Sequence, residues 1–235
     1  MVQAQWKRPP LTRQEADDLF MLTFADDPAD TPRVAMDDLR FWAMSTFAHC
    51  LQSYARRQRL AWYVTSLLPI AFDCPGAARK RTVTPDTFVA FAADHPRTSY
   101  DVAAEGGTFP PFVLEVASPS SIDRDQQEKR RTYELLGARE YALFTPREGD
   151  SSTLEGYHSD SANRFMPWLP DEHGRLWSAV LGLHIVVRGP LLQAQTAEGQ
   201  LLPTPEESEA ARQRAEQESA QLRSELNRYR SQHDG

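Results

Sequence analysis

Residues 110–146 restrict the fold more than any other part of the chain, and their sequence is PPFVLEVASPSSIDRDQQEKRRTYELLGAREYALFTP. The apolar run at 112–114 lies between prolines and a serine-rich turn, which is typical of a strand covered on both faces. A helix is expected from residue 123 or 125 to residue 136, ended by Gly137 in the left-handed conformation. Residues 140–145 predict a return strand. Because the links are short, the crossover should be right-handed and the two strands should be parallel neighbours.

Two helices are expected before this unit. Thr12 and Glu15 have the spacing of a capping box, in which each side chain satisfies a free backbone amide, so a short helix should cover 13–24. Apolar residues recur at helical spacing over 37–57, with aspartates in the first turn and arginines in the last, where they suit the helix dipole. This second helix should therefore be longer and should pack through one apolar face.

The rest of the central region is expected to be β structure. Strand pieces at 82–84 and 88–91 should flank the Pro-Asp pair that ends at Asp86, because proline removes a ladder donor and suits a bend. The apolar pattern over 151–187 predicts short strands that extend the same sheet in antiparallel fashion. A final hairpin is expected over 191–202. The fold class is therefore α/β, with a mixed sheet and flanking helices.

The composition changes after Pro203, where glutamate, arginine, glutamine and alanine dominate and predict a charged helix. Ala215, Leu222 and Tyr229 share one heptad position, whereas the other core position is mostly polar. This pattern indicates either a solvated tail or a weak coiled coil that associates loosely. The chain should thus comprise an N-terminal segment with a short helix, a central domain and a helical tail, at residues 1–33, 34–203 and 204–235.

The charge and the cysteine content exclude several classes of protein. The formal net charge of -7 offers no general attraction to nucleic acid, so any such contact needs a local basic patch. Cys50 and Cys74 do not have the spacing to each other and to histidine that a zinc site requires. Both are expected to be buried free thiols in a reducing cytosol. No apolar run approaches the roughly 20 residues that cross a bilayer. A cytoplasmic protein without membrane contact is predicted.

Two carboxylates and a lysine suggest chemistry at the strand ends. Asp86 and Glu115 could hold a divalent ion that binds a phosphate oxygen and offsets developing negative charge. Lys129 could orient or deprotonate the attacking water or stabilise the transition state. The alternative for each carboxylate is a solvated charge at a strand end, since both motifs are short.

Three blocks of sequence, TPDTFVAF, PPFVLEVASPSS and DRDQQEKRRTYELLGAREYALFTP, resemble the Uma-two family of restriction endonucleases, a branch of the PD-(D/E)xK nucleases. The resemblance covers most of the chain. It implies a restriction-endonuclease-like core and a DNA endonuclease that depends on Mg²⁺ or Mn²⁺. Asp86 matches the aspartate of the PD motif and Glu115 the acidic residue of the second motif. The carbonyl of Val116 is the third metal ligand expected from this match.

The sequence departs from the (D/E)xK motif at residue 117, where the motif has lysine and this chain has alanine. Lys129, on the following helix, fits the place where the resembled family carries its lysine. Asp125 could pair with Lys129 one turn along that helix, although a helix-capping role explains it as well. Ser118 could bind Glu115 or phosphate, although a turn serine before proline is sufficient explanation. The helix at 37–57 offers no clear glutamate as an extra acid.

Basic residues close to these motifs are candidates for contact with the phosphate backbone, and the alternative is that they form solvated surface. The candidates are Arg79, Lys80, Arg81, Arg124 and Arg130. A homodimer would suit cleavage of both DNA strands. The competing hypothesis is a catalytically silent module with the nuclease fold, which binds nucleic acid or a protein partner through its C-terminal helix.

Overall fold

The computed structural model describes residues 8–24, 37–117, 125–149 and 151–233. A six-stranded sheet with the order β1-β4-β6-β7-β8-β9 forms its centre. Its strands are β1 (Tyr63–Ser66), β4 (Thr87–Ala90), β6 (Phe112–Val116), β7 (Glu140–Thr145), β8 (Thr153–Ser159) and β9 (Phe165–Pro167). β6 and β7 pair in parallel, and the other neighbours pair antiparallel. The fold is mixed α/β with flanking helices, as the sequence predicts.

The unit that links β6 to β7 has the expected order of strand, helix and parallel strand. Its helix starts as a π-helical turn, η1 (Asp125–Lys129), and continues as α4 (Arg130–Leu136). Gly137 ends α4 with φ of 91°, a left-handed conformation that costs glycine little. In the parallel register Glu115 lies beside Leu143, so the carboxylate sits near the C-terminal end of both strands.

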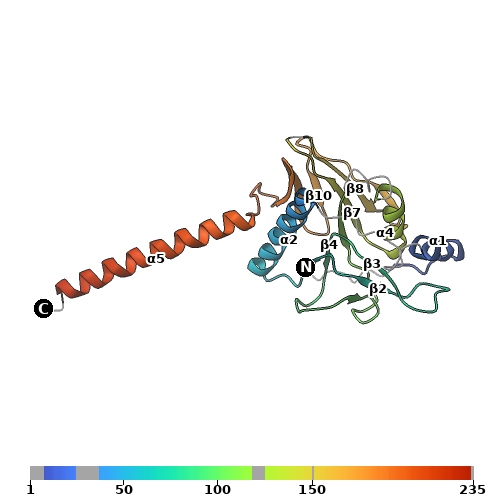
Figure 1. Ribbon diagram of the computed structural model, residues 1–235, viewed down its shortest axis with the longest axis horizontal. Helices are drawn as coiled ribbons and strands as arrows, with labels where there is room; N and C mark the ends of the chain where they lie inside the picture. Colours follow the sequence, from blue (N-terminus) through green and yellow to red (C-terminus); the bar gives the residue numbers. More distant parts are fainter. Residues whose placement is uncertain (1–7, 25–36, 118–124, 150, 234–235) are drawn as a thin grey trace. The chain divides into compact units, whose positions relative to one another are not determined.

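Both faces of the sheet are covered, with α2 on one side and α4 on the other (Figure 1). The side chains of β6 alternate between the two apolar layers. Phe112, Leu114 and Val116 pack with α2 (Asp38–Gln58), and Val113 and Ala117 pack with α1 (Arg13–Phe24) and α4. A strand whose side chains are all buried matches the prediction from its continuous apolar run. Glu115 follows the same alternation and points to the α4 side.

Helix boundaries agree closely with the capping signals. The Thr12 amide donates to the Glu15 carboxylate at 2.8 Å, and the Glu15 amide donates back to the Thr12 hydroxyl at 3.3 Å, at the start of α1. Asp37, expected within the first turn of α2, is instead its N-cap and accepts from the Arg40 amide at 2.8 Å. Arg59 closes α2 with φ of 54°. Local sequence therefore determines where α1 and α2 begin.

Two smaller sheets correct the expectation of one continuous extension. β10 (Leu176–Ser178), β11 (Leu183–Arg188) and β12 (Leu191–Gln195) form a separate antiparallel sheet. Their apolar side joins the core with α2, and none of the three strands pairs with β9, the edge of the central sheet. β2 (Ile70–Phe72), β3 (Arg81–Val83) and β5 (Tyr100–Asp101) form the third sheet. The two strand pieces flanking Asp86, β3 and β4, consequently belong to different sheets.

A second compact unit begins at Pro203 and contains the helix α5 (Pro205–His233). Thr204 and Glu207 make a capping box at its start, with the Thr204 amide donating to the Glu207 carboxylate at 2.9 Å and the Glu207 amide donating back at 3.2 Å. The described side chains after the first turn of α5 are exposed to solvent. Across the described residues, no helix is both long and apolar enough to span a membrane.

Candidate active site

The pairing of β4 with β6 brings Asp86 to the end of β6. Thr87 lies opposite Leu114, which places the preceding residue, Asp86, beside Glu115 and Val116. The Val116 amide donates to the Asp86 carboxylate at 2.7 Å, and Asp86 is only 6% exposed. The two carboxylates predicted from short motifs 29 positions apart are thus neighbours on adjacent strands, and backbone pairing determines their positions.

Glu115 is held by two side chains from the crossover helix. The Lys129 ammonium donates to Oε2 of Glu115 at 2.9 Å, and the Tyr133 hydroxyl donates to Oε1 at 2.6 Å. Lys129 and Tyr133 are four residues apart, so they lie on one face of the helix. The Lys129 side chain is 28% exposed, whereas that of Glu115 is 1% exposed. The cation therefore lies between a buried carboxylate and the solvent.

Tyr133 is a buried residue of α4 whose ring packs in the core and whose hydroxyl contacts Glu115. Burial raises the pKa of Tyr133 well above its usual value, and the negative charges of Glu115 and Asp86 raise it further. The hydroxyl therefore keeps its proton at neutral pH and remains a donor to Glu115. The sequence signal that could have identified this contact is the spacing of Tyr133 from Lys129.

A residue that the sequence reasoning missed, Arg40, reaches the same strand end from the opposite layer. Nε of Arg40 donates to the Val116 carbonyl at 2.7 Å, and Nη2 lies 3.3 Å from one oxygen of Asp86 and 3.5 Å from the other. The side chains of Arg40 and Asp86 are 11% and 9% exposed. Arg40 shares the buried stripe of α2 with Met44 and Phe47, and a charged residue at such a position is the signal that could have identified it.

The oxygen atoms of the cluster are of the kind that bind a divalent cation. Carboxylates and a backbone carbonyl are the ligands that Mg²⁺ prefers. The Arg40 guanidinium bridges Asp86 and the Val116 carbonyl, so these oxygens already face one cation. Among the described residues, no group of three or more His, Cys, Asp or Glu side chains lies where it could hold a metal. The donor set therefore fits a cation, and a protein cation occupies part of it.

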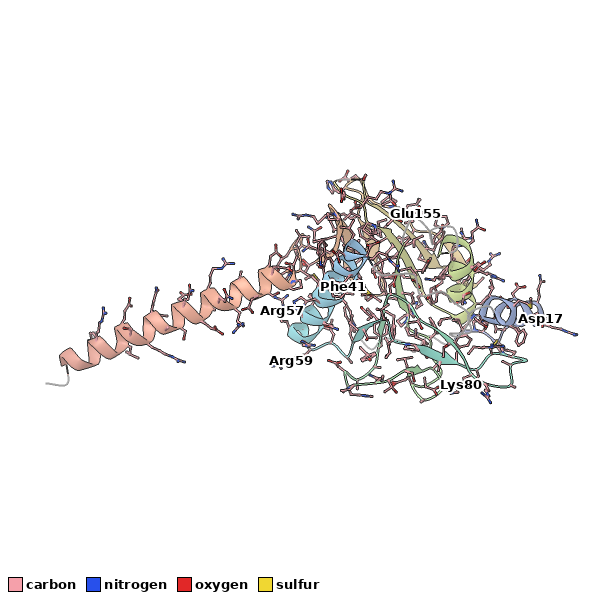
Figure 2. The ribbon with its side chains drawn as sticks, viewed as in Figure 1. Asp17, Phe41, Arg57, Arg59, Lys80 and Glu155 are labelled. Carbon is pink, nitrogen blue, oxygen red and sulfur yellow. The ribbon has the colours of Figure 1, made fainter. Side chains whose placement is uncertain are left out.

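The other predicted residues are less closely connected to the cluster. Ser118 and Arg124 lie outside the described residues, and for Asp125 only the backbone is described, within η1. Lys80 donates to Asp101 at 2.6 Å and projects outward from the loop before β3 (Figure 2). Arg79 is exposed in the same loop.

Aromatic rings hold two more of the predicted basic residues. The guanidinium of Arg81 lies 5.3 Å from the ring centre of Phe20, and that of Arg130 lies 4.9 Å from the ring centre of Tyr157. Arg130 directly follows Lys129 in the chain, which makes it the predicted basic residue nearest in sequence to the cluster. The predicted basic patch is therefore divided between the β3 loop and the start of α4.

Comparison with known proteins adds independent findings. The model of the Uma2 family, described as "Putative restriction endonuclease", matches residues 34–187. A search of curated proteins found no match. A crystal structure of "a putative nuclease belonging to DUF820" from Anabaena variabilis aligns with a TM-score of 0.44 and 14% identity, over 60% of this chain and 73% of that one. The residues matched by the family model include Arg40, Asp86, Glu115 and Lys129.

Proposed function

This chain belongs to the Uma2 family of restriction endonucleases, and from that membership we propose that it is a metal-dependent endonuclease that hydrolyses phosphodiester bonds in DNA. The reaction would take place where β6 ends, with Asp86, Glu115 and Lys129 as its catalytic groups. The observation that carries the proposal is the 2.9 Å contact between Lys129 and Glu115. Through this contact, Lys129 on the crossover helix takes the place of the motif lysine that is absent at position 117, where the residue is alanine.

The contacts of the cluster indicate a task for each side chain. When bound, Mg²⁺ or Mn²⁺ held by Asp86, Glu115 and the Val116 carbonyl supplies Lewis acidity and offsets charge on the phosphate. The Val116 amide holds the Asp86 carboxylate in position, and Tyr133 holds Glu115. Lys129 lies at the solvent side of Glu115, where its ammonium can orient the attacking water and stabilise charge on the phosphate oxygens.

DNA is the proposed substrate because the cluster combines two buried carboxylates with a partly exposed lysine at the end of β6. With a formal net charge of -7, the attraction to the backbone has to be local. Arg130, next to Lys129, and the basic loop at 79–81 are the proposed backbone contacts. A dimer would present two such sites to the two strands of a duplex.

One observation favours a second function, a silent nuclease-fold module that binds nucleic acid or a protein partner. Arg40 and Lys129 offset the charges of Asp86 and Glu115 one to one, and Arg40 contacts two of the proposed metal ligands. In a cluster paired in this way, the charges of the two carboxylates are offset by side chains of the protein and not by a metal ion.

A cleavage assay on supercoiled plasmid and short duplexes distinguishes the two functions. The wild type is compared with Asp86→Asn, Glu115→Gln and Lys129→Met, in Mg²⁺, in Mn²⁺ and in EDTA. Arg131→Met is the matched control, because Arg131 is on the same helix but pairs with Glu134 and Asp18. The endonuclease requires metal-dependent nicking that the three substitutions abolish and the control retains. A wild type that binds duplex DNA without cleaving it in either metal supports the silent module.

A further inference from the structure

We propose that Arg40 is a built-in competitor of the metal ion: its guanidinium and a divalent cation use the same oxygens, so Arg40 has to withdraw before the ion binds. The inference rests on the proposed function, because the ion in question is the metal of the endonuclease. It adds a regulatory residue on α2, a helix for which the sequence suggested no site residue.

The competition follows from the contacts of the guanidinium. Nε lies 2.7 Å from the Val116 carbonyl oxygen, and Nη2 lies 3.3 Å from an oxygen of Asp86. Mg²⁺ binds its oxygen ligands at about 2.0–2.1 Å and demands near-octahedral geometry. An ion bound to both oxygens would therefore sit against the guanidinium. Like charges at that separation repel strongly in a site screened this little by water.

The charges of the cluster lead to the same conclusion. With Arg40 and Lys129 in place, the positive charges equal the negative charges of Asp86 and Glu115. A dication added to this arrangement would bring two excess positive charges, whereas departure of Arg40 removes one of them and frees the oxygens that it contacts. Binding of the ion is thus an exchange of one cation for another.

Arg40 is well placed for such an exchange. It lies in the first turn of α2, three residues after the N-cap Asp37, and its side chain retains 11% exposure. A long, flexible side chain at that position can turn toward solvent without moving the helix. A DNA phosphate is a favourable partner for the released guanidinium, because guanidinium groups bind phosphate oxygens in bidentate fashion.

The alternative is that Arg40 only braces α2 against β6. A brace and a competitor both contribute to stability, but they differ in metal binding. Loss of a brace leaves the affinity for the ion unchanged or weaker, because the ligands lose their positions. Loss of a competitor makes the affinity higher.

The test measures Mn²⁺ binding by calorimetry and by electron paramagnetic resonance, independently of cleavage. Arg40→Met should bind Mn²⁺ about tenfold or more tightly than the wild type. The gain should disappear in the double variant Arg40→Met with Asp86→Asn. Arg97→Met is the matched control, because Arg97 forms a comparably buried pair with Glu105, at 2.7 Å, on another part of the chain. Equal or weaker Mn²⁺ binding in a folded Arg40→Met protein overturns the inference.

A second measurement avoids dependence on the folding of Arg40→Met. The Arg40 Nε–H group donates to a buried carbonyl and should give a slowly exchanging NMR signal, assigned by its loss in Arg40→Lys. Mg²⁺ should abolish this signal as the site fills. A signal that persists while Asp86-dependent Mg²⁺ binding saturates also overturns the inference. Tighter Mn²⁺ binding in Arg40→Met without cleavage by the wild type would retain the competitor and reject the endonuclease.

A second inference comes from an independent observation, a groove along α5. Its walls are Ala215, Glu218, Ser219, Leu222, Arg223 and Leu226. Leu222, Leu226 and Tyr229 are 59%, 49% and 61% exposed. Ala215, Leu222 and Tyr229 take the d positions of a heptad repeat, and Ser219 and Leu226 take the a positions. The groove therefore runs along the face that a two-stranded coiled coil would bury.

We infer that a second copy of this chain occupies the groove, with the two α5 helices parallel. In that arrangement a g residue of one helix faces the e residue five positions later on the other. Glu218 then meets Arg223 of the partner subunit, and the charges attract. An antiparallel pair would instead bring g positions together, where Glu218 and Glu225 repel each other. Since apolar residues fill only about two heptads, the dimer should be weak and dependent on concentration.

Sedimentation of the full chain, followed by cross-linking, tests the dimer. The wild type should dimerise at high concentration, and the double change Leu222→Glu with Leu226→Glu should keep it monomeric. Ser219→Cys should form an intermolecular disulfide on oxidation, because a positions face each other in a parallel pair. Gln217→Cys, on the outer face, is the control and should not. A monomeric wild type, or equal cross-linking of both cysteine variants, overturns the inference.

Discussion

Glu140 should make the folding stability of this protein fall as the pH rises from about 4.5 to about 7. Glu140 begins β7 and is 4% exposed. Burial raises its pKa from 4.5 to about 7, although hydrogen bonds from the Ser178 hydroxyl and the Val180 amide act in the opposite direction. The folded state therefore binds a proton that the unfolded state releases.

The size of the effect follows from the two pKa values. Below pH 4.5 the Glu140 carboxyl is neutral in both the folded and the unfolded state. Folding then carries no cost for burying a charge, so the folding stability is at its highest with respect to this group. Between 4.5 and 7 the unfolded state ionises first, which favours unfolding. One pKa unit corresponds to about 1.4 kcal/mol, so the total loss is on the order of 3 kcal/mol and is complete above pH 7.

Glu140→Gln should remove this dependence. The amide has nearly the same shape, its oxygen can accept from the Val180 amide, and its NH₂ can donate to the Ser178 hydroxyl, which is able to reverse its role. Urea unfolding of the wild type and variant is measured from pH 4 to 8. Glu155→Gln is the control, because Glu155 is exposed on β8 (Figure 2). Parallel stability curves for the wild type and Glu140→Gln would refute the reasoning.

Two further changes have calculable effects. Tyr133→Phe removes the hydroxyl that donates to Glu115 at 2.6 Å. Because that hydrogen bond is made to a charged group, the free energy of unfolding measured in urea should fall by about 1.5–3 kcal/mol. Plasmid nicking should fall as well. Unchanged stability and activity would show that Glu115 keeps its position without this hydrogen bond. Gly156→Ala places a Cβ 2.6 Å from Trp168 and 2.9 Å from Leu176. Thermal unfolding followed by calorimetry should therefore show a loss of folding stability of about 1–3 kcal/mol. An unchanged melting temperature would mean that the indole of Trp168 can shift to make room.

The sequence by itself determined the parts of this protein that depend on neighbouring residues. A capping box placed the start of α1, and Gly137 placed the end of α4, because backbone amides and carbonyls at helix ends need local partners. Apolar periodicity placed the start of α2 to within one residue, although the N-cap role of Asp37 was not predicted. The apolar run of β6 and the short crossover predicted a buried parallel pair. Family resemblance then selected Asp86 and Glu115, which the antiparallel pairing of β4 with β6 brings together.

Tertiary structure alone decided what surrounds those carboxylates. Arg40 and Val116 are 76 positions apart, and no local pattern specifies that the two layers converge at the end of β6. The division of the β strands into three sheets likewise depends on which surface α2 leaves to be covered. Local hydrogen bonding is encoded over a few residues, whereas the partners of a buried charge depend on how the whole core packs.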